Sequence, residues 1–175
     1  AEHTAYGIPF PAVGERFDRY EEQLEIITGL WGTPAGGTYS FSGEHYQLTD
    51  SPALPKPVQA GGIPVWIGGH TEAAVRRAAT LGDGWHPIAL RPPGLLFPDA
   101  YAKRAQQIQT WAREAGRDPR AITLSVRVPM EVRPGRLEAP TGERPLFQGT
   151  ADQVIGDIRA YAAAGVTHFV WDFTN

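Results

Sequence analysis

Four short apolar runs after residue 63 alternate with segments in which apolar residues recur every three or four positions. The runs include Val65, Trp85, Ile122 and Val166. The spacing in the other segments predicts helices at about 71–81, 99–115 and 150–165. Strands separated by helices of this length require right-handed crossovers, so the pattern predicts an α/β fold with a parallel sheet.

The first third of the chain has a different pattern. Residues 1–17 are interpreted as a loop that leads into a helix, and apolar spacing predicts that helix at 14–32. Alternating, aromatic-rich residues predict a β-hairpin over 38–48, and the Pro- and Gly-rich stretch 49–64 is expected to run extended over the surface. Residues 38–64 are therefore interpreted as an insertion in a single domain that spans 1–175.

Local signals mark several helix ends. Gly116 has the residue type that commonly follows a helix, and Gly165 closes the last predicted helix in the same way. Thr150 and Gln153 have the spacing of a capping box.

Two architectures accommodate four strand–helix units. One is an open sheet with helices on both faces, and the other is half of an eight-stranded (β/α) barrel. A complete barrel needs about 250 residues, so a chain of 175 residues supplies only part of one.

Composition narrows the classes of partner. A net charge of -3 gives no electrostatic reason to expect nucleic acid or a membrane surface as a partner. The sequence contains no apolar run long enough to cross a membrane, no secretory leader and no cysteine, and we expect a cytoplasmic protein. Because the chain begins at Ala1 rather than Met, we expect either a removed initiator or the later part of a longer protein.

The stretch 64–79 combines an apolar run, a glycine pair and a helix start. Gly68 and Gly69 let the backbone approach a ligand closely, and His70 and Thr71 lead into a helix whose first N–H groups attract anions. The Thr71 hydroxyl suits either a phosphate oxygen or the helix cap. Spacing alone leaves two interpretations open, a phosphate site and a plain strand-to-helix turn.

Other polar residues favour structural interpretations. His70 and His86 have pKa values suited to proton transfer, but His70 is expected in an exposed loop and His86, beside Pro87, in a structural role. Asp83 and Gly84 suit a turn before a strand, and Asp172 suits a polar strand end. The remaining histidines lack metal-ligand spacing, and no serine sits between the glycines of a nucleophile elbow, so neither a metal site nor hydrolase chemistry is predicted.

Taken together, six motifs resemble the luciferase-like monooxygenase superfamily, especially its branch that depends on the deazaflavin coenzyme F420. They occur in the order and approximate spacing of that family, at 14–31, 41–48, 55–59, 63–69, 81–87 and 114–119. The resemblance covers nearly the whole chain and implies strands five to eight of a (β/α)8 barrel, with the first four strands outside this sequence.

The resemblance also implies a role for particular residues. Family members bind FMN or F420 at the carboxyl ends of the strands, and Gly68 and Gly69 match the glycine pair that approaches the cofactor phosphate. His70 and Thr71 begin the helix behind that pair, and Arg91 falls where some F420 enzymes place a basic residue against the phosphate tail. The redox and acid/base groups come mostly from the missing half, so the catalytic residues remain unassigned.

The resemblance implies part of an oxidoreductase that transfers hydride to or from a small organic substrate, with F420 as the expected cofactor. An FMN-dependent monooxygenase is one alternative. Another is a non-catalytic half barrel that dimerises and binds a phosphate-bearing ligand. In each case the exposed sheet edges predict pairing with a missing N-terminal half or self-association as a homodimer.

Overall fold

The computed structural model describes residues 2–59, 61–138 and 144–173. These residues form two compact units, Ala1–Ile63 and Pro64–Asn175. Whether the two units belong to one partial-barrel domain, as the sequence predicts, stays a prediction.

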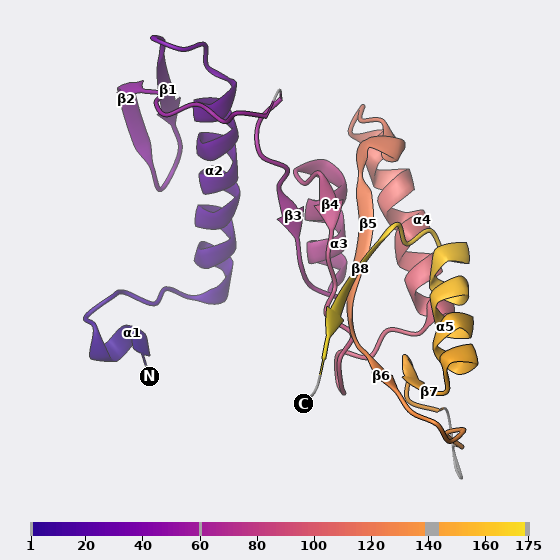
Figure 1. Cartoon of the computed structure of the whole chain (residues 1–175). Helices are drawn as coiled ribbons and strands as arrows, with labels where there is room; N and C mark the ends of the chain where they lie inside the picture. The colour runs from indigo at the N-terminus through magenta and orange to yellow at the C-terminus, as the bar shows by residue number, and fades with distance from the viewer. Residues whose placement is uncertain (1, 60, 139–143, 174–175) are drawn as a thin grey trace. The chain divides into compact units, whose positions relative to one another are not determined.

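The first unit consists of two helices and a hairpin (Figure 1). The long helix α2 covers Val13–Gly32, and strands β1 (Thr38–Ser42) and β2 (Gln47–Pro52) pair antiparallel. The predicted helix and hairpin are thus confirmed. The expectation of a loop before the helix is wrong at its start, because Glu2–Ala5 form the short helix α1.

The hairpin is tied to α2 by a carboxylate and a tyrosine ring. Glu22 accepts hydrogen bonds from the backbone N–H groups of Glu44, His45 and Tyr46, at 2.7, 3.1 and 3.0 Å. The Tyr39 ring lies so close to Gly29 that a Cβ at this position would overlap it. A glycine on α2 therefore lets the hairpin pack directly on the helix backbone.

The second unit is a four-stranded parallel sheet with helices (Figure 1). Its strands are β3 (Trp66–Ile67), β4 (Gly84–Trp85), β5 (Thr123–Pro129) and β8 (His168–Asp172), hydrogen-bonded in that order. The intervening helices are α3 (Glu72–Thr80), α4 (Pro98–Glu114), the single turn η1 (Pro119–Ala121) and α5 (Ala151–Ala163). The predicted α/β class and parallel sheet are confirmed.

The core of this unit lies between the helices and one face of the sheet. Side chains on that face include Ile67, Trp85, Val126 and Val128, all at most 3% exposed. The Trp85 ring packs 4.8 Å from Tyr101 of α4, which in turn lies 5.8 Å from Tyr161 of α5. Because strand side chains alternate between faces, the residues between these point to the opposite side.

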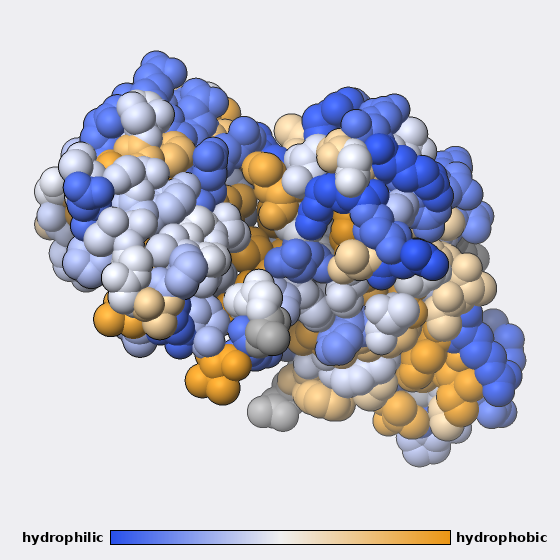
Figure 2. Space-filling view, turned by 90° about the horizontal axis from the view of Figure 1, so that it is seen from above, coloured by the Kyte–Doolittle hydropathy of each residue, from blue (hydrophilic) through white to orange (hydrophobic). Residues whose placement is uncertain are grey.

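That opposite side is the open face of the sheet. It carries Trp66, His86, Arg127 and Asp172, which are half-buried, and His168, which is exposed. Val170, also on this face, is 37% exposed, and Ile88 beyond β4 is 47% exposed. Figure 2 shows apolar residues at the surface of the molecule, as orange areas among blue ones.

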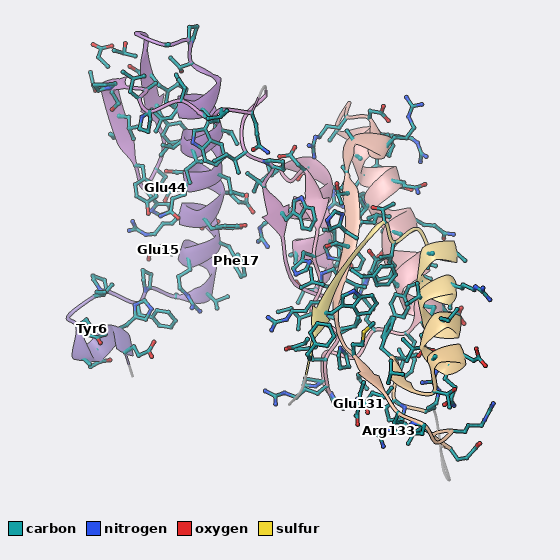
Figure 3. All side chains as sticks on the ribbon, viewed as in Figure 1. Tyr6, Glu15, Phe17, Glu44, Glu131 and Arg133 are labelled. Atoms are coloured by element: carbon teal, nitrogen blue, oxygen red, sulfur yellow. The ribbon has the colours of Figure 1, made fainter. Side chains whose placement is uncertain are left out.

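A second, smaller sheet follows β5 and was missed by the sequence analysis. Strands β6 (Glu131–Val132) and β7 (Gln148–Gly149) pair in parallel between β5 and α5. Figure 3 labels Glu131 and Arg133, which form an ion pair on this segment. Two-residue strands are too short to produce a detectable alternation.

The helix caps follow the predicted local chemistry. The Thr71 hydroxyl accepts a hydrogen bond from the Ala74 N–H, and Thr150 and Gln153 form the predicted capping box at the start of α5. Gly116 and Gly165, at φ +72° and +102°, adopt the left-handed conformation after α4 and α5. Among the described residues, no helix has the length and apolar character needed to span a bilayer.

Candidate functional site

The loop from β3 to α3 depends on its two glycines for its own geometry. Gly69 has φ +110°, and a Cβ there would lie 2.9 Å from the Ala74 Cβ. A Cβ at Gly68 would lie 3.3 Å from the His86 carbonyl oxygen. The Trp85 indole N–H also donates to the Gly69 carbonyl at 2.9 Å. Close packing of the turn against β4 and α3 therefore explains both glycines.

The same loop exposes backbone N–H groups. Among the hydrogen bonds of the described residues, none occupies the N–H groups of His70, Thr71 or Glu72. They lie at the start of α3, where the helix dipole adds positive potential. The loop therefore has the donors that an anion needs, beside a cap already satisfied by Thr71.

His70 joins this loop to the one after β4. Its Nε2 lies 2.8 Å from the Ile88 carbonyl oxygen, which only accepts, so Nε2 carries the proton. A Cβ at Gly94 would lie 3.8 Å from the same Nε2. His70 thus has a structural contact, and it brings the loop that contains Arg91 beside the glycine pair.

Arg91 is exposed and lines a cavity of about 220 Å³. Arg144 lines the other side of this cavity, but its guanidinium is paired with Asp157 at 2.5 Å. No hydrogen bond or ion pair of the Arg91 side chain is found among the described residues. Arg91 is therefore the cation of this cavity that remains available to a ligand.

A polar cluster occupies the open face next to these loops. We call it the open-face cluster; it consists of Trp66, His86, Ser125, Arg127, His168 and Asp172. Arg127 and Asp172 form an ion pair at 2.9 Å. The Trp66 ring lies over Gly84, where a Cβ would be 2.7 Å from its nearest atom, and it contacts the His168 ring edge-on at 5.2 Å. The register of β5 and β8 sets Ser125 beside His168.

His86 is the titratable group of this cluster with a perturbed pKa. Its ring lies 5.8 Å from Trp66, and its Nδ1 is 2.6 Å from Ser125 Oγ. Partial burial lowers the pKa of His86, and the positive charges of Arg127 and His168 lower it further. The imidazole is therefore neutral at pH 7.

Ser125, Arg127 and Trp66 were not predicted from the sequence as site residues. The signal available for two of them was the alternation Thr123, Ser125, Arg127 along an otherwise apolar strand. Asp172, expected as a polar strand end, proves to be the partner of Arg127, and Asp83 lies in a bend where its carboxylate accepts from the Val65 N–H at 2.9 Å. Within the described ranges, no group of three His, Asp or Glu side chains is placed to hold a metal ion.

Comparison with known proteins identifies the class. The sequence pattern of the luciferase-like monooxygenase family matches residues 1–142. The chain belongs to this family.

Three of the individual relatives share between 14% and 32% sequence identity with the chain. The chain is 32% identical over 89 residues to an F420-dependent glucose-6-phosphate dehydrogenase of Microbacterium testaceum, which covers 51% of this chain and 25% of that protein. An F420-dependent secondary alcohol dehydrogenase, solved in complex with an F420-acetone adduct, superposes with a TM-score of 0.75 at 18% identity over 94% of this chain and 58% of that one. A long-chain alkane monooxygenase gives a TM-score of 0.75 at 14% identity, covering 97% and 54%. The chain thus spans just over half of the solved enzymes that it matches.

Proposed function

We propose that this chain is the second half of a luciferase-like oxidoreductase barrel, and that it holds the phosphate end of an F420 coenzyme. The intact enzyme would transfer hydride to or from a small organic substrate. One observation carries the proposal: the loops after β3 and β4, tied together by His70, present free N–H groups and the cation Arg91 at one edge of the sheet.

The sheet supports the barrel interpretation. Its helices pack on the face that holds Trp85 and Val126, whereas the opposite face carries the open-face cluster. The wall of a barrel has this one-sided arrangement, because helices cover its outer face and the side chains on its inner face pack against those of the other strands. An open sheet with helices on both faces would bury the two sides alike.

The donors at this edge fit a phosphate group. Backbone N–H groups at the start of α3 and an unpaired guanidinium are the usual partners of phosphate oxygens. The phosphate would bind the backbone of Gly68, Gly69, His70 and Thr71. Arg91 would bind a negative charge further along the coenzyme tail. The coenzyme would supply the hydride chemistry, and the groups that shape its redox face would come from the missing half.

FMN is the alternative coenzyme, because the resemblance to the luciferase-like family implies binding of either FMN or F420. FMN has one phosphate on a short arm, whereas F420 carries a longer anionic tail. Arg91 lies on the second loop, so it would contact the longer tail of F420 more readily than the short phosphate arm of FMN.

The test is a titration of the chain with F420 and with FMN, followed by coenzyme fluorescence. We expect Arg91→Gln to weaken F420 binding about 10- to 100-fold, the loss of one charge-assisted hydrogen bond. Arg120→Gln, which removes an exposed arginine beyond the amino end of β5, is the control and should leave affinity unchanged. Equal affinities for wild type and Arg91→Gln would refute the role of Arg91, and a chain that binds neither coenzyme would refute the proposed function.

Gly69 is a poorer target for substitution, because any side chain at φ +110° strains the loop itself.

A further inference from the structure

Ser125 determines which nitrogen of His86 carries the proton. Ser125 Oγ lies 2.6 Å from His86 Nδ1 and 3.1 Å from the Trp85 carbonyl oxygen. A hydroxyl has one hydrogen to donate, and a carbonyl oxygen can only accept. Both contacts are satisfied when Ser125 donates to Trp85 and His86 Nδ1–H donates to Ser125. The opposite assignment would leave two acceptor oxygens 3.1 Å apart.

The other ring nitrogen, Nε2, is then an acceptor. Neutral imidazole carries a proton on one nitrogen and a lone pair on the other. Among the described residues, no hydrogen bond uses His86 Nε2. Because Ser125 is completely buried and holds Nδ1 against the sheet, the ring stands on the open face.

Partial burial favours the neutral form of His86, and the groups around the ring act in the same direction. Arg127 on β5 and His168 on β8 face it from the neighbouring strands, Asp172 is paired with Arg127, and His70 is bonded to Ile88. A second positive charge on the His86 ring would be repelled by Arg127. A neutral acceptor beside a cation suits a ligand oxygen that bears a hydrogen, since the hydrogen meets the lone pair and the oxygen meets the positive potential.

We propose that His86 Nε2 accepts a hydrogen bond from the hydroxyl group of an alcohol substrate, with Ser125 as the positioning residue that orients the ring. The inference rests on the proposed function for the existence of a substrate, but the state of His86 is a property of this chain alone. It assigns a binding role to a residue for which the sequence analysis favoured a structural one.

The first test measures the tautomer of His86 by nitrogen-15 NMR of the labelled chain at neutral pH, without coenzyme. We expect a protonated Nδ1 and an unprotonated Nε2, and in Ser125→Ala a shift toward a mixture of the two tautomers. A protonated Nε2 in the wild type would overturn the inference. The wild-type spectrum decides this point even if the variant does not fold.

The second test compares two probes of nearly the same shape, propan-2-ol and acetone. Propan-2-ol donates a hydrogen bond and should shift the His86 Nε2 resonance, whereas acetone at the same concentration should not. Equal shifts from both probes, or no shift from either, would overturn the hydroxyl assignment. Neither test involves coenzyme, so loss of F420 binding with the expected tautomer and probe response would refute only the proposed function.

Discussion

Two arginine–aspartate pairs in the sheet unit differ mainly in exposure. Arg144 and Asp157 lie 2.5 Å apart with side chains 20% and 10% exposed, and Asp157 also accepts from the Phe147 N–H at 2.6 Å. Arg120 and Asp118 lie 2.9 Å apart with side chains 90% and 49% exposed. When a buried pair loses one member, the remaining charge has little water to solvate it. When an exposed pair loses one member, water solvates the remaining charge.

Asp157→Ala should therefore lower the free energy of unfolding by about 3 kcal/mol. The Arg144 guanidinium would lose its only carboxylate partner among the described residues and keep the carbonyl oxygens of Pro145 and Gln148, and the Phe147 N–H would lose its acceptor. Arg120→Ala is the matched control, because it breaks the exposed pair and leaves Asp118 as the cap of η1, and its midpoint in urea should not differ measurably from wild type. Equal destabilisation by the two variants would contradict the role given to burial.

At the scale of elements, one carboxylate of α2 binds the turn of the hairpin β1–β2. Burial of Glu22 acts to raise its pKa, but the three backbone N–H donors from Glu44, His45 and Tyr46 outweigh it and lower the pKa below its ordinary value. A carboxyl group whose pKa is lowered by folding stabilises the folded state when ionised. The hairpin contact is therefore at full strength above the unfolded-state pKa of about 4.3 and is lost as pH falls through the lower, folded value.

We expect amide hydrogen exchange at residues 44–46 to speed up below about pH 4.3, after correction for intrinsic exchange rates. Glu22→Ala should speed up exchange at these amides already at pH 7. Glu25→Ala, which removes an exposed carboxylate one turn further along α2, should not. Unchanged protection in Glu22→Ala would show that other contacts hold the hairpin.

At the scale of the whole molecule, the main sheet, as far as the described residues show, has an unpaired edge on each outer strand and no helix packed on its open face. β3 and β8 are the outer strands, and their free edges offer backbone groups to another strand. Val170 and Ile88 add exposed apolar surface to the open face. If this unit is half of a barrel, as we propose, a complementary half or a second copy would cover that surface.

The chain alone should therefore form dimers at micromolar concentration, measured by light scattering after size-exclusion chromatography. Val170→Lys places a charge on the open face and should shift the protein to monomer. Ile155→Lys, at a similarly exposed apolar residue on α5, should leave the dimer intact. A wild-type monomer would contradict self-association.

Much of the local structure followed from the sequence. Apolar spacing located α2, α3, α4 and α5, and the hydrogen bonds of Thr71 and Thr150 followed from residues only three positions apart. The parallel direction of the strands followed from the helices between them. These features depend on periodicity and on short-range contacts, which the order of residues contains directly.

The tertiary structure alone decided which distant residues meet. The contacts of His86 with Ser125, Arg127 with Asp172 and Arg144 with Asp157 join residues 39, 45 and 13 positions apart. They depend on strand register and on the packing of loops, and no local pattern encodes either. The sequence by itself predicted an α/β chain that resembles the luciferase-like family, and it left the loop at Gly68–Thr71 with two interpretations, a phosphate site and a plain strand-to-helix turn. The structure added the link from His70 to Ile88 and the orientation of His86 on the open face, because both require a fixed distance between separate strands.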